Sequence, residues 1–241
     1  MDDHSPTHLR WLATTVLGLG LLLSAPAQAA LHVQATRVIY DGSAASASLA
    51  LSNKGTLPYM AQAWLDRGDA SSMPANLPIT ITPPLMRLAA GEEAVLRVIH
   101  SGTGLPADRE SLFWINVQEI PPRTQDSNVL QVAIRTRVKL FYRPKGLRTT
   151  LDANIRSLRW QLRNDTLVVS NPGPLHITFV HVQGQASAGP RKRIDLDMIA
   201  PGQSFALPLS QLGHPPGDTL RFAYINDHGG VTEVDEAAIE R

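Results

Sequence analysis

Two parts of the 241-residue sequence combine positive charge with apolar surroundings in a way that could bind an anion. The stretch VLQVAIRTRVKLFYRP, residues 129–144, carries four cations in its second half: Arg135, Arg137, Lys139 and Arg143. Arg37 lies inside a second apolar run, ATRVIYDG, where a charged group needs a partner or a ligand. If neighbouring strands bring Arg37 and Lys139 together, the two cations would suit a carboxylate, because charge-assisted hydrogen bonds are strong.

The first half of the same stretch has a different character. Leu130, Val132 and Ile134 alternate with Gln131 and Ala133, so one face of the segment is apolar. This alternation predicts a single long β-strand over residues 129–144, with a core-type face at its start and cations toward its end.

Signals for enzymatic chemistry are weak. No G-x-S-x-G, P-loop or H-E-x-x-H motif occurs, and the absence of cysteine excludes thiolate metal sites. His176 and His181 are five residues apart on one predicted strand, so they face opposite sides and are expected to be exposed or half-buried. We therefore predict no catalytic residues, no metal and no cofactor, and the net charge of +1 gives no argument for nucleic acid.

The remaining sequence indicates an all-β protein. Short alternating apolar runs are separated by turn residues, with 18 prolines and 17 glycines in all, and no long amphipathic helix is evident. The pattern stops at Pro144 and restarts, which predicts two β-sandwich domains, at residues 30–146 and 147–241.

The first 29 residues are expected to lie outside the fold. Arg10 precedes a thirteen-residue apolar run, and Ala27-Gln28-Ala29 gives the A-x-A cleavage pattern of an export signal. The run is too short to span a bilayer comfortably, so we predict a cleaved signal peptide at residues 1–29 and no membrane insertion afterwards.

Eight segments carry a resemblance to a known family. They are, in chain order, ATRVIYDG, LSNKGTLPYMAQAWLD, PPLMRL, SLFWINVQEIPP, NVLQVAIRTRVKLFYRP, VSNPGPLHITFV, MIAPGQSFALPL and YINDHGG. Together they resemble the periplasmic pilus chaperones, boomerang-shaped pairs of immunoglobulin-like domains that escort pilin subunits. The resemblance covers essentially the whole chain after the signal peptide.

The resemblance implies a role for individual residues. Arg37 and Lys139 match the family's two cleft cations, which hold the C-terminal carboxylate of the pilin. The family's alternating donor-strand residues match Leu130, Val132 and Ile134. Its interdomain charge cluster is matched to Glu119, Arg143 and Asp227, which leaves Arg135 and Arg137 as an expected solvated face.

The resemblance also implies partners and a compartment. We expect a non-enzymatic chaperone that lends a strand to pilin subunits in the periplasm and delivers them to an outer-membrane usher. The short connection from Pro122 to Asn128 resembles the short-loop branch, which builds rod-like, adhesin-tipped pili. The sequence leaves open whether the free form self-associates to hide its apolar strand face.

Two other functions compete with this interpretation. A two-domain adhesin or carbohydrate-binding protein would need aromatic platforms, but the three tryptophans that remain after cleavage, Trp64, Trp114 and Trp160, are expected in cores. A secreted β-sandwich hydrolase would need a nucleophile constellation, and none is visible.

Overall fold

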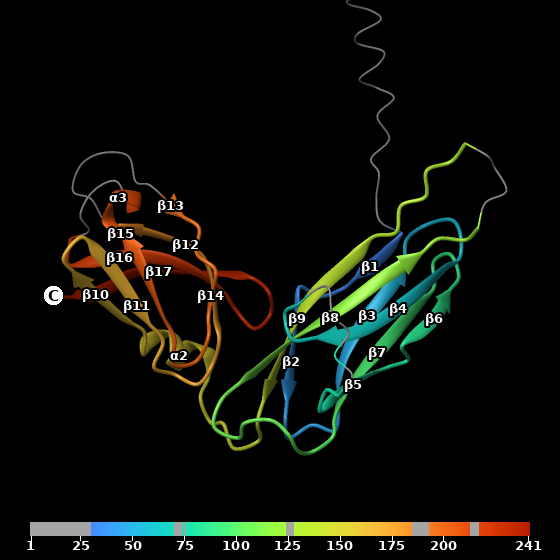
Figure 1. The fold of residues 1–241 in the computed structure, drawn as a ribbon, viewed down its shortest axis with the longest axis horizontal. Coiled ribbons are helices and arrows are strands. Elements are labelled where there is room, and N and C mark those ends of the chain that lie inside the picture. Colours follow the sequence, from blue (N-terminus) through green and yellow to red (C-terminus); the bar gives the residue numbers. More distant parts are fainter. Residues whose placement is uncertain (1–29, 70–73, 75, 124–127, 185–192, 213–216) are drawn as a thin grey trace, which may run out of the picture.

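The computed structural model describes residues 30–69, 74, 76–123, 128–184, 193–212 and 217–241, so the predicted signal peptide lies outside the described residues. Two β-sandwiches stand at an angle to each other and meet at one end (Figure 1). The expected all-β fold with two domains in an L is confirmed. No helix among the described residues is long and apolar enough to cross a membrane.

The N-terminal sandwich consists of two sheets around one core. The first sheet has the order β1 (Leu31–Val33), β3 (Ala47–Asn53), β7 (Glu93–His100) and β5 (Ile79–Thr82). The second has the order β2 (Arg37–Asp41), β9 (Arg135–Arg143), β8 (Ser111–Ile120), β4 (Tyr59–Asp66) and β6 (Leu85–Leu88). Alternate residues of these strands point inward, as strand geometry requires, and include the fully buried Leu51, Leu96, Phe113, Ile115 and Leu140.

Two continuous segments of the chain divide between the sheets. The chain remains part of the first sheet as far as Gln34, whose amide donates a 3.0 Å hydrogen bond to the Ala50 carbonyl. The next strand, β2, belongs to the second sheet. In the same way β5 and β6 lie in different sheets on either side of Pro83 and Pro84, which lack amide donors. Through the first of these crossings β2 comes to lie beside β9, in parallel.

The prediction of one strand over residues 129–144 is wrong in its first part. Strand β9 begins only at Arg135. Just before it, the Ile134 carbonyl accepts a 3.0 Å hydrogen bond from the Glu119 amide, which is the last backbone hydrogen bond between this segment and β8. The neighbouring chain then reaches Pro121 and Pro122, which cannot donate to a ladder. On its other side β2 pairs with β9 only from Lys139 onward, so Val129–Ala133 has no strand partner within the described residues.

The C-terminal sandwich is one sheet that folds over on itself. Its path runs β13 (Arg193–Ile194), β12 (Ile177–Gly184), β16 (Thr219–Ile225), β17 (Val231–Glu240), β10 (Arg159–Arg163), β11 (Thr166–Ser170) and β15 (Ser204–Pro208), with β14 (Met198–Ile199) on β12. Strand β17 pairs with β16 along most of its length and with β10 at its end, so it belongs to both faces. Short helices α2 (Leu151–Arg156) and α3 (Leu209–Leu212) complete the domain.

Aromatic side chains fill the centre of this second core. The ring of Phe222 lies 5.4 Å from that of Trp160 and 5.7 Å from that of Phe179, centroid to centroid. Strands β10 and β11 form a hairpin, and Asn164 in its turn has a φ of 52°.

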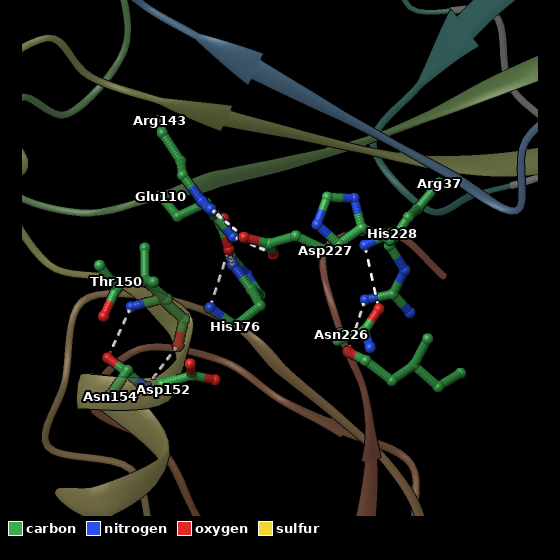
Figure 2. Close-up of polar contacts among 12 residues, drawn as sticks. Arg37, Glu110, Arg143, Thr150, Asp152, Asn154, His176, Asn226, Asp227 and His228 are labelled. Atoms are coloured by element: carbon green, nitrogen blue, oxygen red, sulfur yellow. Dashed lines mark hydrogen bonds and ion pairs between the residues drawn. The ribbon is translucent and has the colours of Figure 1, made fainter. Parts of the chain in front are cut away.

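An ion-pair cluster joins the two domains (Figure 2). Arg143, at the end of β9, donates two hydrogen bonds of 2.6 and 2.7 Å to Asp227 in the β16–β17 turn. It donates a third, of 2.8 Å, to Glu110, whose other oxygen accepts from the His176 amide and contacts His176 Nδ1 at 2.9 Å. Burial would lower the pKa of Arg143, but the hydrogen bonds to Asp227 and Glu110 outweigh it and raise that pKa.

The β16–β17 turn fits closely against the N-terminal domain. Asn226 Oδ1 accepts from the amides of His228 and Gly230, which shapes the turn. Gly229 has φ of +82°, and a Cβ there would overlap Thr36 Oγ1 just before β2. Glycine is therefore required at this position both by its backbone conformation and by the close approach of the domains.

The assignment of Glu119 to the interdomain cluster is wrong, and Glu110 takes that place. Glu119 is 5% exposed and accepts a 2.9 Å hydrogen bond from the Leu31 amide inside the N-terminal domain. The two glutamates flank opposite ends of β8, about 30 Å apart at strand rise. Since β8 and β9 are antiparallel, the end of β9 that carries Arg143 lies beside the beginning of β8, near Glu110.

We predict that Arg143→Met lowers the free energy of unfolding by roughly 2–4 kcal/mol, because Glu110 would stay buried without its guanidinium partner. Thermal and chemical unfolding would measure the loss, and small-angle scattering would report a wider distribution of domain angles. Arg109→Met is the matched control, because Arg109 pairs with Asp108 at the surface, where both side chains are more than half exposed. Equal stability of the two variants would contradict the role given to Arg143.

Candidate functional site

Arg37 and Lys139 lie side by side, as the family resemblance implied. The two residues are direct partners in the parallel ladder of β2 and β9, so their side chains leave the same face of the sheet. Adjacent strands are about 4.8 Å apart, which brings both cations within reach of one small ligand. The site lies next to the domain junction, because the same ladder ends with Asp41 opposite Arg143.

Arg37 is half-buried and only partly satisfied. Its Nη1 donates a 3.0 Å hydrogen bond to the Ile225 carbonyl of the C-terminal domain, while its buried Nε has no hydrogen-bond partner among the residues that the structure describes. Burial lowers the pKa of Arg37, and the charges of Asp227 and Glu110 act in the opposite direction. Both acids are engaged by Arg143, so Arg37 itself receives no carboxylate bond in the described part of the chain.

Lys139 is also half-buried and has no ion-pair partner among the described residues. The ammonium instead lies 5.4 Å from the centroid of the Trp114 ring. Burial lowers the pKa of Lys139; the negative charge of Asp197 acts in the opposite direction, and the positive charge of Arg37 adds a smaller lowering. The fold thus holds two neighbouring cations, in a partly dehydrated place, with no acid bound to either.

This arrangement is suited to an anion with more than one acceptor atom. Two unneutralised cations with free N–H donors can each give a charge-assisted hydrogen bond to one oxygen of a carboxylate. Such a ligand would also relieve the repulsion between the cations and satisfy the orphaned donor of Arg37.

An exposed apolar segment leads up to this pair. Leu130 is 88% exposed and Val132 is 61% exposed, while Ile134, closest to β9, is 39% exposed. These three residues alternate with Gln131 and Ala133, so their side chains would share one face when this segment pairs as a strand. Large apolar side chains in such a row on an open edge indicate a site for another protein.

The other two cations on β9 differ from the solvated face that the sequence predicted. Arg137 donates to both carboxylate oxygens of the buried Asp66, at 2.8 and 3.1 Å, and its guanidinium lies 4.5 Å from the Trp114 ring centroid. Arg135 is exposed, with its guanidinium 5.9 Å from the Trp64 ring centroid. The expectation of a solvated side chain is therefore wrong for Arg137.

The prediction that all three tryptophans lie in cores is correct for one of them. Trp160 is buried in the C-terminal core, but Trp64 and Trp114 are half-buried on the outer face of the N-terminal sheet. Arginine side chains lie over both indoles, so these rings are not open stacking platforms of the kind a carbohydrate-binding protein needs.

The two histidines are more buried than expected. The side chain of His176 is 8% exposed and contacts Glu110, and that of His181 is 7% exposed and lies 3.7 Å from Glu233. They belong to separate environments, but not because of their odd spacing: His176 precedes β12, and a register shift between Phe179 and His181 interrupts the alternation. Within the residues that the structure describes, no group of three or more His, Cys, Asp or Glu side chains could hold a metal ion.

Two family models match the chain. The model described as pili and flagellar-assembly chaperone, PapD N-terminal domain, matches residues 30–148. The model described as pili assembly chaperone PapD, C-terminal domain, matches residues 153–236. Together they cover nearly all of the described chain.

Curated relatives agree with these models. The probable fimbrial chaperone YadV of Escherichia coli K12 is 37% identical over 214 residues, which are 83% of this chain and 87% of the relative. The chaperone protein FimB/FhaD of Bordetella pertussis is 36% identical over 243 residues, 95% and 98% of the two chains.

Solved structures give the same result. The Pseudomonas aeruginosa CupB2 chaperone superposes with a TM-score of 0.73 at 32% identity and covers 86% of this chain and all of that one. The SafB chaperone, solved in complex with the SafA pilin of Salmonella enterica, superposes with a TM-score of 0.74 at 28% identity, over 89% and 98% of the chains. The chain therefore belongs to the family of pili and flagellar-assembly chaperones.

Proposed function

We propose that this chaperone binds pilin subunits in the periplasm by lending them a strand, and that it delivers them to an outer-membrane usher. It acts by binding alone, with no catalysis and no cofactor. The single observation that supports this most is the unneutralised pair Arg37 and Lys139 beside an exposed row of apolar side chains. Residues 30–146 would form the pilin-binding domain and residues 147–241 the second domain, after removal of residues 1–29.

The cation pair would fix the position of the guest chain. A pilin ends in a carboxylate, and Arg37 and Lys139 would each donate to it, at about 1.5–3 kcal/mol per charge-assisted bond. Because a slip of one residue turns every side chain of a strand to the wrong face, a fixed terminus sets the register of the whole pairing.

The apolar row would supply the missing part of the guest's core. In β-augmentation an extended segment adds to an open sheet edge, and its alternate side chains enter pockets of the partner. Leu130, Val132 and Ile134 would contribute about 1.5–3 kcal/mol each on full burial. The absence of a strand partner for Val129–Ala133 in the described structure leaves its backbone groups available for this pairing.

The solved pair of SafB chaperone and SafA pilin supports a pilin as the guest, since that chaperone superposes on this chain. The class of pilus stays a prediction from sequence. The connection from Pro122 to Asn128 is short, as in the branch that builds rod-like, adhesin-tipped pili, and its residues 124–127 lie outside the described residues.

We predict that Arg37→Ala and Lys139→Ala each abolish the recovery of soluble pilin, because the guest would lose half of its carboxylate anchor. The measurement is the yield of chaperone–pilin complex on co-expression, with circular dichroism to show that each variant is folded. Lys145→Ala removes an exposed cation just past β9 and serves as the control. Recovery of pilin at the wild-type level by either anchor variant would refute the anchor.

We predict that Leu130→Glu and Val132→Glu also prevent capture, because a charge would enter the apolar groove of the guest without a partner. Ala133→Glu adds the same charge to the same exposed segment on its other face, and it should reduce capture far less. Complex yields that fall equally for all three variants would argue against an alternating, strand-like engagement.

We predict that pilin affinity falls as the pH rises through the lowered pKa of Lys139, since the neutral amine no longer attracts the carboxylate. Burial places this loss below the pH at which a free lysine titrates, near 10.4. Lys139→Arg keeps its charge, so its affinity should hold across the same range. The dissociation constant of the purified complex, measured against pH for both proteins, checks this, and parallel curves would contradict it.

A further inference from the structure

Four side chains form a row across the outer face of the N-terminal sheet. Asp66 of β4 is the ladder partner of Trp114 of β8, Trp114 is the partner of Lys139 of β9, and Lys139 is the partner of Arg37 of β2. Direct partners in a sheet point to the same face, so these four side chains are neighbours in that order. The two proposed anchor cations are thus one end of a longer arrangement.

The Trp114 ring lies close to two cations of β9. The centroid of its ring is 4.5 Å from the Arg137 guanidinium carbon and 5.4 Å from Lys139 Nζ. An aromatic face attracts an ammonium through its quadrupole but accepts no strong hydrogen bond from it. Lys139 is therefore held in place while its three N–H donors stay available, whereas a carboxylate neighbour would compete with an anionic ligand.

The acid at the other end of the row is fully neutralised. The side chain of Asp66 is 0% exposed and accepts from Arg137 Nη2, from Asn116 Nδ2 at 2.6 Å and from the Gly68 amide at 2.7 Å. Arg137 binds both of its oxygens. Without that guanidinium, a buried negative charge would lie two strands, about 10 Å, from Lys139 and repel an anion bound there.

We propose that Trp114 and the Asp66–Arg137 pair are positioning residues for the carboxylate site: the indole holds Lys139 extended and unpaired, and Arg137 cancels the one buried acid in the row. This inference rests on the proposed carboxylate anchor and adds to it. The anchor would then depend on residues that need not touch the pilin at all.

Acetate, as the smallest carboxylate, and neutral acetamide, as its isostere, are suitable probes. The sequence holds only four lysines, Lys54, Lys139, Lys145 and Lys192, so their side-chain Cε resonances can be assigned by substitution in the full protein. Wild-type protein should show a saturable acetate-dependent shift at Lys139, no such shift at the exposed Lys54 and Lys145, and no response to acetamide.

Substitutions in the row should then weaken acetate binding in a defined pattern. Trp114→Leu should raise the dissociation constant about three- to tenfold through loss of the aromatic contact, and Trp114→Phe should largely restore it. Trp64→Leu removes the indole near Arg135 instead and should leave binding within about twofold of wild type.

The acid–base pair gives a second, independent test. Arg137→Met should weaken acetate about five- to tenfold through the uncompensated charge of Asp66, and Asp66→Asn combined with Arg137→Met should recover most of the loss. A merely structural role of the pair predicts no such recovery, because the double variant lacks the salt bridge as well. Thermal unfolding identifies variants that are not folded.

The outcomes separate the two proposals. If wild-type Lys139 does not respond to acetate, the carboxylate anchor and the positioning role both fail. If wild type binds acetate and Trp114→Leu, Arg137→Met and Trp64→Leu bind it equally well, the anchor stands and the positioning role is refuted.

Discussion

The parallel ladder between β2 and β9 is the constraint on which the rest of this molecule depends. It exists because the chain leaves the first sheet after Gln34 and enters the second, beside a strand more than ninety residues away in sequence. This ladder places Arg37 next to Lys139 and, four residues on, Asp41 next to Arg143. The proposed anion site and the domain junction are therefore fixed by one set of backbone hydrogen bonds, and a shift of one residue would turn Arg37 toward the core.

The distribution of acids decides which cations are structural. Glu110 and Asp227 both bind Arg143, so that residue joins the domains, while Arg37 receives only a backbone carbonyl from the second domain. The Lys139 ammonium lies over the Trp114 ring instead. Leaving two half-buried cations without an acid disfavours the free protein, as functional sites commonly do, and a carboxylate ligand would remove that cost.

The exposed apolar segment has a similar logic. An unpaired edge with large apolar side chains is a liability for a protein that acts alone, because it can pair with any open strand. Here it follows directly from local sequence: Pro121 and Pro122 end the pairing of β8, and β2 begins too late to cover the other side. In a family of chaperones, an unpaired segment that another protein chain can pair with is consistent with the binding of a client protein.

Much of this could be predicted from the sequence. Alternation and turn residues predicted the two β-sandwiches and the apolar row Leu130, Val132 and Ile134. These features depend on the face to which a residue points, which a period of two determines by itself. The pairing of Arg143 with Asp227 came from the family resemblance and is present in the structure.

Only the tertiary structure decided which groups meet across strands and domains. Glu119 and Glu110 both lie next to or within β8, and strand direction alone sends the first to Leu31 and the second to Arg143. Arg137 reads as a surface cation until β4 brings Asp66 beneath it. Periodicity fixes the side of a sheet, but the neighbouring strand, its direction and its register are set by the packing of residues far apart in the chain, and those determine the partners of Arg137 and Arg143.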